Sequence, residues 1–464
     1  MIKRSLLLFM MLFACAQMFA QKKVPKTDGT ITVAMKPESW TAKNDAANLK
    51  FADHKGVPSL EVTDGNEQAK PSNINFSSGT IEFDLEFIEG FTSFFFRYQS
   101  EEEYELFYLR NRPDDITATD GVQYAPIIKK VNMWDMYPNY QTAANFKKGE
   151  WTHIKLVISG VQMLVYVNDK NPTLVVPRLE GNTKDGTIGF SGKCFVSNLV
   201  IKPNQVEGLS AMGEFDPVYN DNRFISSWFI SEPVDFPAGN ECSNSNPPGF
   251  ETKWKKITAE RNGLINVSRL YGQSTSRRMV WLRTTLKTKK EEKRKINLGF
   301  SDEVWVFVNG RTAYADKNLY AQDLRKEPDG RLSVENAQFE LSLKEGNNDI
   351  LIGLSNDFYG WGIIARLENR IGVEYIDYVP EVLNKEFEPY FGMYASKDTP
   401  FKLKVSQLSN KLSIQATGEG PIATESAGNG VYKIDNFGIT LEFNAAEKKM
   451  YFRRGTTTYE FIKE

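Results

Sequence analysis

Histidine and cysteine are scarce in this chain of 464 residues. There are two histidines, His54 and His153, and three cysteines, Cys15, Cys194 and Cys242. A site of three histidines cannot be built, and the two histidines do not have His-Glu-x-x-His spacing. The cysteines are too scattered for a zinc finger or ribbon. A Ser-His-Asp or Cys-His system would have only these two histidines as its base.

Common catalytic motifs and a strong excess of charge are also missing. The chain has no Gly-x-Ser-x-Gly, Ser-x-x-Lys, phosphate loop or Gly-x-Gly-x-x-Gly. The 57 Lys and Arg nearly balance the 59 Asp and Glu, so no net charge draws the protein to nucleic acid. We interpret the basic run 287–295 as a solvated hairpin or edge strand. No cofactor or metal is expected, and any catalysis would rest on carboxylates.

The only long apolar run lies at the amino terminus. Residues 1–20 place two cations before an unbroken apolar stretch over 6–13, which is typical of a secretory signal peptide. The stretch is too short to span a bilayer as a helix. We therefore expect a periplasmic or secreted protein. Lipoprotein processing at Cys15 is the alternative, which Phe13 disfavours.

Aromatic residues and short alternating strands are abundant. The chain has 31 Phe, 19 Tyr and 8 Trp. Apolar and acidic residues alternate from Ile81 to Phe87, and Val304–Val308 alternates into Asn309-Gly310. This dipeptide is the strongest short hairpin signal, because both turn positions accept positive φ. No segment sustains helical spacing over four turns, so the sequence predicts an all-β protein.

The strand pattern lapses around 203–216 and again around 371–388. These lapses divide the chain after the signal peptide into three predicted domains, at 24–205, 212–370 and 385–464. Cys194 and Cys242 fall in different domains, so the sequence leaves open one inter-domain disulfide or two free thiols.

The first domain resembles the concanavalin-like sandwich superfamily, which includes laminin-G-type modules, lectins and some glycoside hydrolases. The motifs that carry the resemblance are Gly-Thr-Ile-Glu at 79–82, Trp-Thr-His-Ile at 151–154, Ile-Gly-Phe at 188–190 and Val-Ser-Asn at 196–198. Sandwiches of this type often hold structural calcium. The candidate ligands Asp114, Asp115 and Asp120 are equally typical of ordinary turns.

Three acids alternate along one predicted strand of this domain. Glu82, Asp84 and Glu86 are similar to the Glu-x-Asp-x-Glu strand of a sandwich family that cleaves β-glucans. The resemblance implies Glu82 as nucleophile, Asp84 as the residue that tunes it and Glu86 as acid/base. Residues four apart on a strand have Cα atoms roughly 13 Å apart, whereas a retaining pair needs carboxyls about 5–5.5 Å apart. The alternative is a half-buried strand whose acids face water.

A second region of the first domain is rich in groups that recognise sugars. Aromatic faces stack on sugar rings, and Arg binds hydroxyls or carboxylates. Trp134 and Tyr137 lie in a stretch typical of a loop, where they either meet a ligand or plug one end of the sandwich. The candidate residues of this region are Tyr108, Arg110, Tyr124, Trp134 and Tyr137.

The middle domain resembles galactose-binding-like jelly rolls, which occur as carbohydrate-binding modules. The residues that carry the resemblance are Ser301-Asp302, Asn309-Gly310-Arg311, Gly346-Asn347-Asn348 and Gly360-Trp361-Gly362. Trp361 is either an exposed sugar platform or a core anchor at a tight bend.

The third domain resembles the small lipocalin-like β domain that often follows penicillin-recognising serine hydrolases. Its cues are a Tyr-x-Gly-x-Tyr start at 390–394, the strand 412–415 and a terminal aromatic strand at 459–461. The hydrolase and its Ser-x-x-Lys motif are absent, so the resemblance implies a cap or interaction module.

The order of modules resembles that of otherwise uncharacterised secreted bacterial proteins. The leading hypothesis is a non-catalytic protein that binds a glycan or another cell-surface polymer. The alternatives are a glycoside hydrolase or sugar-modifying enzyme that uses carboxylates of the first sandwich, and a structural adaptor without a small ligand. The sequence leaves the ligand, the catalytic status of the first domain and the oligomeric state open.

Overall fold

The computed structural model describes most of the chain after its amino terminus. The described residues are 29–110, 117–213, 221–243, 247–249, 252–320, 323–376, 384–408 and 411–464. The predicted signal peptide, Cys15, Asp114 and Asp115 lie outside these ranges. Within them, no helix has the length and apolar character needed to cross a membrane.

The chain divides into two units. The first comprises residues up to Gln99, Glu105–Tyr124 and Gln141–Gly213, and the second comprises Ser100–Tyr104, Ala125–Tyr140 and Glu214–Glu464. The segment Ala125–Tyr140 therefore belongs to the second unit, although it lies inside the predicted first domain 24–205.

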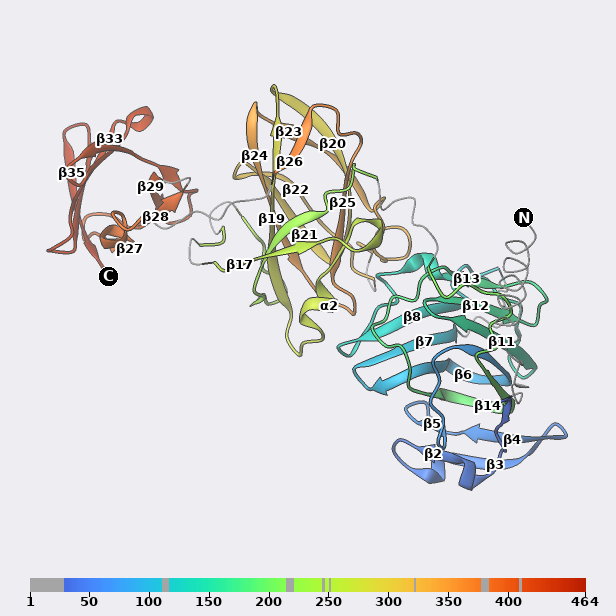
Figure 1. Ribbon diagram of the computed structural model, residues 1–464. Helices are drawn as coiled ribbons and strands as arrows, with labels where there is room; N and C mark the ends of the chain where they lie inside the picture. The colour runs from blue at the N-terminus through green and yellow to red at the C-terminus, as the bar shows by residue number, and fades with distance from the viewer. Residues whose placement is uncertain are drawn as a thin grey trace, which may run out of the picture. The chain divides into compact units, whose positions relative to one another are not determined.

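Most of the first unit belongs to a 14-stranded sheet whose described pairs are antiparallel (Figure 1). This sheet also includes β9 and parts of β6, β7 and β8 that the division above counts with the second unit. Its path runs β10-β8-β7-β6-β11-β12-β13, and β14 pairs with β1, β4, β5 and β6. The strands are β1 (Ile31–Thr32), β2 (Trp40–Ala42), β3 (Leu49–His54), β4 (Val57–Val62), β5 (Gln68–Pro71), β6 (Gly79–Ser100), β7 (Glu103–Arg110), β8 (Val122–Ile128), β9 (Val131–Asn132), β10 (Gln141–Thr142), β11 (Trp151–Ser159), β12 (Gln162–Val167), β13 (Leu174–Val176) and β14 (Thr187–Pro203).

The core of the first unit is aromatic. Phe83 and Phe94 of β6 meet Phe190 of β14, with ring centroids 4.9 to 5.3 Å apart. The alternation seen from Ile81 to Phe87 buries every apolar residue and puts Glu82, Asp84 and Glu86 on the other face. The period of two thus sets which face of β6 is core.

Residues 227–376 of the second unit form two antiparallel sheets. The 8-stranded sheet has the order β17-β15-β19-β24-β21-β22 with β16 and β26 on β19, and the 4-stranded sheet has the order β18-β25-β20-β23. The elements are β15 (Ser227–Ser231), β16 (Val234–Asp235), β17 (Trp254–Thr258), β18 (Leu264–Asn266), α2 (Val267–Tyr271), β19 (Arg278–Thr288), β20 (Glu292–Ser301), β21 (Glu303–Val308), β22 (Arg311–Lys317), β23 (Ala337–Leu343), β24 (Gly346–Ser355), β25 (Gly362–Leu367) and β26 (Val373–Ile376).

One apolar cluster joins these two sheets. Leu282, Val306 and Ile352 come from the larger sheet, and Phe300 and Ile363 from the smaller one, all of them buried. Burial of apolar area between two sheets is the main force that holds such a module together. The sandwich ends therefore consist of the loops that pass from one sheet to the other.

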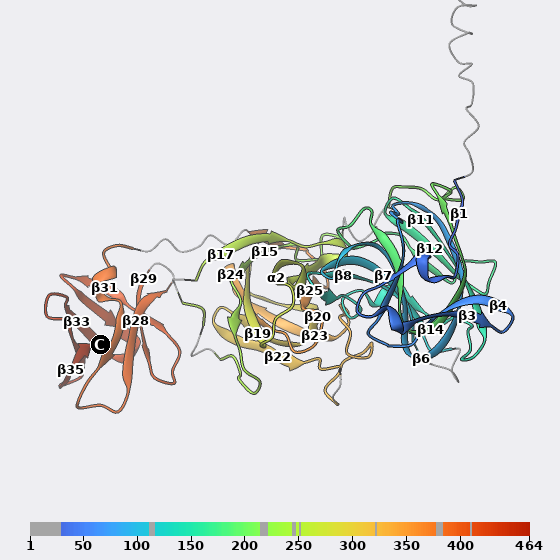
Figure 2. The same cartoon turned by 90° about the horizontal axis from the view of Figure 1, so that it is seen from below.

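The carboxyl-terminal residues form a separate 9-stranded antiparallel sheet, which is curved in Figure 2. Its buried apolar side chains form one cluster, which includes Leu441, Met450 and Phe461. Its order is β30-β29-β28-β27-β35-β34-β33-β32-β31. The strands are β27 (Gly392–Ala395), β28 (Lys402–Leu408), β29 (Lys411–Ala416), β30 (Ile422–Ala423), β31 (Glu425–Gly428), β32 (Val431–Ile434), β33 (Ile439–Asn444), β34 (Lys449–Arg454) and β35 (Thr457–Lys463).

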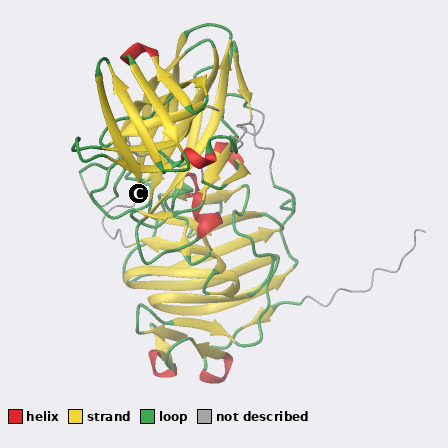
Figure 3. Cartoon of the chain, turned by 90° about the vertical axis from the view of Figure 1, so that its left-hand side faces the viewer, coloured by secondary structure: helices red, strands yellow, loops and turns green. Residues whose placement is uncertain are grey.

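The predicted all-β class is confirmed, as Figure 3 shows by the small share of helix. The 3-10 turns are η2 (Pro37–Ser39), η3 (Ala46–Asn48), η4 (Pro138–Tyr140), η6 (Arg261–Gly263), η7 (Glu388–Tyr390) and η8 (Asp435–Phe437). The predicted hairpin is also confirmed: β21 pairs with β22 across Asn309 and Gly310, whose φ values are 51° and 75°. The prediction for the basic run 287–295 is wrong in both forms. The run spans the end of β19 and the start of β20, which lie in different sheets and each have a strand on both sides, so it is neither a paired hairpin nor an edge strand.

Candidate functional site

One loop of the second unit presents aromatic side chains at an end of the sandwich. Residues 356–361 read Asn-Asp-Phe-Tyr-Gly-Trp and connect β24 of the larger sheet to β25 of the smaller one. We call this segment the aromatic loop. Such inter-sheet loops are free of ladder hydrogen bonds, so other groups must fix their backbone.

Two buried carboxylates fix the aromatic loop. Asp302 accepts hydrogen bonds from the backbone N–H groups of Asp357 and Phe358, the latter at 2.8 Å. Asp135 accepts from the N–H of Gly360 at 2.9 and 3.2 Å. Three N–H groups within four residues thus end on two carboxylates, which specifies one loop conformation.

Burial dominates the electrostatics of these two acids. Desolvation raises the pKa of Asp302 to about 7, against the lowering effect of its backbone and Ser301 hydrogen bonds. Desolvation also raises the pKa of Asp135 well above its usual range, and the nearby Asp302 adds to this shift. Each group therefore holds its proton more tightly than an exposed aspartate does.

The backbone of the loop is close to its neighbours. A Cβ on Gly360 would lie 2.4 Å from Asp135 Oδ1 and from Met136 Cγ, so only glycine fits there. Tyr359 has φ 53°, in the left-handed region that side chains rarely adopt. This strained conformation turns two adjacent aromatic side chains outward.

Phe358 and Tyr359 are the exposed aromatic residues of the loop, 40% and 50% accessible. Their ring centroids are 4.4 Å apart in an edge-on arrangement. Tyr320 lies parallel to Phe358 at 5.8 Å, and the buried Trp134 meets Tyr320 at 4.8 Å and Tyr359 at 5.9 Å. Rings supported in this way lose little entropy when a flat ligand packs on them.

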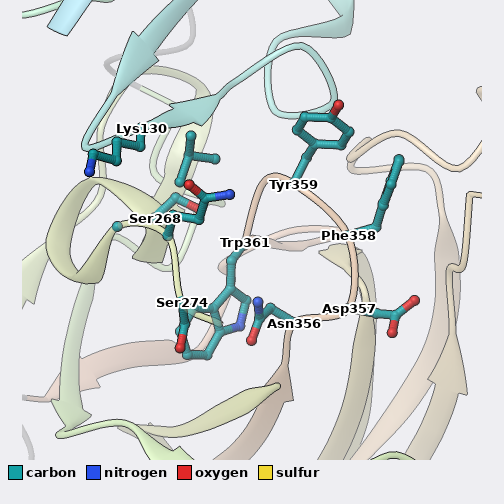
Figure 4. A pocket seen from close by; sticks show the side chains of 11 residues that line it. Lys130, Ser268, Ser274, Asn356, Asp357, Phe358, Tyr359 and Trp361 are labelled. Atoms are coloured by element: carbon teal, nitrogen blue, oxygen red, sulfur yellow. The ribbon is translucent and has the colours of Figure 1, made fainter. Parts of the chain in front are cut away.

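A cavity of about 290 Å³ adjoins these rings. Figure 4 shows Lys130 and Tyr359 at one end, Ser274 and Asn356 at the other, and Trp361 between them. This volume lies near the lower end of the roughly 300–1,000 Å³ typical of small-ligand sites. The lining residues are Lys130, Val131, Ser268, Gly272, Gln273, Ser274, Asn356, Asp357, Phe358, Tyr359 and Trp361.

Trp361 was predicted as either a sugar platform or a core anchor. The side chain is 1% exposed and belongs to the sandwich core, and it also lines the cavity. Its backbone carbonyl accepts the N–H groups of Val267 and Ser268 at 2.9 and 3.1 Å, which joins α2 to the loop.

Trp134 and Tyr137, the two predicted loop aromatics, are buried within the second unit. The Tyr137 hydroxyl lies 3.1 Å from Glu260 Oε2 and 3.2 Å from both Asn266 Nδ2 and Arg269 Nη2. The protein itself covers both rings, so neither lies open for a sugar ring.

Three other predicted sugar-binding residues are buried in the first unit. They are Tyr108, Arg110 and Tyr124. Arg110 Nη2 donates to Gln123 Oε1 at 2.6 Å and to the Tyr108 hydroxyl at 3.1 Å, and Tyr108 donates to the same Gln123 oxygen at 2.8 Å. Tyr124 donates to Glu105 at 2.8 Å, and burial raises its pKa. These polar groups are engaged within the protein.

The three acids of β6 share one face but have different partners. Lys202 Nζ donates to Glu82 at 2.7 Å. His153 Nδ1 and Asn198 each lie 2.7 Å from an oxygen of Asp84. His153 Nε2 also lies 3.9 Å from Glu82, so this histidine is close to both acids.

Glu86, the third acid of this strand, is buried. Its Oε2 lies 2.6 Å from Lys55 Nζ and 3.0 Å from His54 Nε2. Both histidines of the chain thus bind acids of one strand, an arrangement that ties β3 and β11 to β6. Hydrolysis by Glu82 and Glu86 stays a prediction.

Neither cysteine in the described residues forms a disulfide. Cys194 is buried, Cys242 is partly buried, and burial raises the pKa of each thiol to about 12. Nor do the described ranges contain a group of three or more His, Cys, Asp or Glu side chains placed to hold a metal ion. Asp120, the one described member of the calcium candidates, lies 3.7 Å from Arg110.

Sequence reasoning missed Phe358, Tyr359, Tyr320 and Lys130. The available signal was the pair of aromatics in Ser-Asn-Asp-Phe-Tyr-Gly, a polar stretch whose composition is that of a turn. Exposed aromatics in such a stretch have no core to fill.

Comparison with known proteins gives only distant structural similarity. No family model matches the sequence, and no curated protein matches it. Among solved structures, the carbohydrate-binding module CBM66 from Bacillus subtilis is 17% identical, with 35% of this chain and 95% of that chain covered and a TM-score of 0.25. A Bacillus subtilis protein of unknown function with a galectin-like fold is 12% identical, with 37% and 94% covered and a TM-score of 0.27. The beta-glucanase of Bacillus licheniformis is 11% identical, with 39% and 100% covered and a TM-score of 0.29. Values this low carry no argument about function.

Proposed function

We propose that this protein binds carbohydrate, without catalysis, through the aromatic loop and the adjoining cavity. The observation that carries the proposal is the pair Phe358 and Tyr359, exposed side by side next to a cavity lined by polar side chains. Sugar rings have apolar faces that pack on aromatic rings and a rim of hydroxyls that needs hydrogen-bonding groups.

The construction of the loop supports recognition over simple packing. Exposed aromatic residues lose the benefit of burial, yet here buried Asp302 and Asp135 hold the loop that displays them. Buried carboxylates are destabilising unless hydrogen bonds compensate them. Such an arrangement is typical of sites where a protein gives up stability for a fixed geometry.

The other modules complete the proposal. We assign the amino-terminal module to a concanavalin-like or laminin-G-type sandwich, residues 212–370 to a galactose-binding-like jelly roll, and 385–464 to a lipocalin-like interaction module. The predicted signal peptide supports export to the periplasm or the outside, where glycans and cell-surface polymers are the available partners.

A glycan array followed by calorimetry tests the proposal. The purified protein should bind at least one glycan class. Phe358→Ala/Tyr359→Ala should weaken that binding by about five-fold or more, since two lost contacts of about 0.5–1.5 kcal/mol each sum to about 1–3 kcal/mol. Phe437→Ala is the matched control, because Phe437 is 51% exposed in the turn η8 of the carboxyl-terminal domain. Absence of binding to every glycan, or equal loss in both variants, would overturn the proposal.

A further inference from the structure

Arg278 lies directly behind the lining of the cavity. At the start of β19, its backbone N–H donates to Asn356 Oδ1 at 2.9 Å, and its carbonyl accepts the Asn356 N–H at 3.1 Å. Its Nη2 donates to the Gly272 carbonyl at 2.7 Å, and its guanidinium carbon lies 5.5 Å from the Trp361 ring. All three neighbours line the cavity.

The positive charge of Arg278 has no close carboxylate among the described residues. The adjacent Arg277 pairs with Glu303, and Arg283 on the same strand pairs with Asp349 at 2.6 Å. Burial lowers the pKa of the Arg278 guanidinium, and Asp235 acts against this from beyond ion-pair distance. A partly buried cation without an anion is unusual, because desolvation of a charge is unfavourable unless it is paired.

Two hydrogen-bond donors at this place are also unused. Trp361 Nε1 and Arg278 Nε are buried atoms without an acceptor in the structure. An unsatisfied buried donor costs about 1–3 kcal/mol, so such atoms call for an explanation. Trp361 lines the cavity with part of its side chain, but Nε1 itself is buried, so an acceptor in the cavity would satisfy this N–H only after the indole ring turns toward it.

The rest of the lining adds donors and little negative charge. Lys130 stands at the rim and lies 3.7 Å from Glu102, a pair in which both side chains are exposed and hence weakly coupled. Asp357 is the single acid of the lining and is exposed, and Figure 4 shows its carboxylate turned away from Lys130 and Trp361.

We propose that the cavity recognises an anionic sugar, a hexose unit that carries a carboxylate or sulfate. The oxyanion pairs with Lys130 of the lining and with the charge of Arg278 behind it, and it accepts a hydrogen bond from Trp361 Nε1 after the indole ring has turned toward the cavity. The sugar ring lies against Tyr359 and Phe358. This inference rests on the proposed function and names its ligand class. Hydrogen bonds to charged groups are about twice as strong as neutral ones, which would give the site its preference.

The test compares matched oligosaccharides by calorimetry with the full chain. Oligogalacturonate and sulfated galactan oligomers represent the two sources of the oxyanion, and neutral galactan oligomers of the same length are the reference. We expect at least one anionic series to bind about ten-fold more tightly than the neutral one. Its affinity should fall as NaCl rises from about 0.01 to 0.1 M, where the Debye length shortens from about 30 to 10 Å.

Three variants test the contributions of Trp361 and Arg278. Trp361→Phe removes the indole N–H together with part of a buried ring, and the neutral ligand measured on the same variant reports the effect of the lost bulk. The anionic ligand should lose about ten-fold in affinity beyond that. Arg278→Lys keeps the charge and should retain part of the preference that Arg278→Gln loses. Melting temperatures of all variants check that they fold.

The outcomes distinguish the two claims. Equal affinity for neutral and anionic oligomers, with loss in Phe358→Ala/Tyr359→Ala, would overturn the anionic inference and leave carbohydrate binding intact. If the protein binds neither series and no other glycan, both the anionic inference and carbohydrate binding are overturned. A preference for the anionic series that survives Trp361→Phe and Arg278→Gln would also overturn the assignment to this cavity.

Discussion

Asp302 makes the stability of the jelly roll depend on pH in the direction opposite to most aspartates. Its carboxylate is buried and accepts backbone N–H groups of the aromatic loop, and burial raises its pKa to about 7. In the unfolded chain the pKa is about 3.9. Between these values the folded state holds a proton that the unfolded state has lost.

The sign and size follow from this difference. A group with a raised folded pKa stabilises most below its unfolded pKa, and this contribution is lost as pH rises through about 7. Each pKa unit corresponds to about 1.4 kcal/mol, so Asp302 should lower the free energy of unfolding by roughly 3 kcal/mol between about pH 4.5 and 8. Asp135, raised for the same reason, acts in the same direction.

Asp302→Asn removes this titration and preserves the geometry. The amide oxygen can accept from the two loop N–H groups, and the amide nitrogen can donate to the Ser301 hydroxyl, which now donates to Asp302 at 2.8 Å. We expect the variant to gain about 3 kcal/mol on the wild type as pH rises from about 4.5 to 8.

Denaturant-dependent hydrogen exchange, read by mass spectrometry on peptides of β21 and β24, measures this module without interference from the others. Asp323→Asn, at an exposed position, is the control and should follow the wild-type profile. Parallel profiles for Asp302→Asn and wild type across this pH range would refute the reasoning, because the buried carboxyl would then not be linked to folding.

Four further predictions use other parts of the structure. Gly360→Ala should lower the melting temperature and weaken glycan binding, because the new Cβ would lie 2.4 Å from an Asp135 oxygen. Such overpacking costs about 1–3 kcal/mol. An unchanged melting temperature would contradict the close approach. Phe83→Ala should destabilise the first unit by about 3–5 kcal/mol in urea unfolding, because the ring is fully buried against Phe94 and Phe190. After unfolding without reductant, both Cys194 and Cys242 should react with a thiol reagent, because both are free thiols. If the two cysteines formed a disulfide, neither would react. Wild type should release no reducing sugar from β-glucan, because Glu82 is held by Lys202; release that Glu82→Gln abolishes would establish hydrolysis.

The strands were predictable because their signals are local. The alternation around Phe83 and the Asn309-Gly310 turn depend on neighbours within a few residues, and both appear in the structure as expected. A period of two and a dipeptide that accepts positive φ act before any tertiary contact forms.

The candidate site was less predictable because its determinants are far apart in sequence. Trp134 lies in a stretch with the composition of an exposed loop, but Arg331, Tyr320 and Tyr359 pack around it. Conversely, Phe358 is exposed in a loop whose backbone N–H groups are held by the distant Asp302. Local pattern does not encode which aromatic residue of a loop is covered by a distant segment.

The anchoring of Gly360 by Asp135 has a consequence for how this protein can be divided. A fragment cut at 212–370 would keep Phe358 and Tyr359 but would lack Asp135, Trp134 and Lys130, which come from the segment Ala125–Tyr140. The Gly360 amide would lose its acceptor, and Tyr359 would lose the ring of Trp134 that supports it. The cavity would lose the part of its rim that Lys130 forms. The proposed binding site is therefore split along the polypeptide, and a single contiguous fragment would not carry it whole.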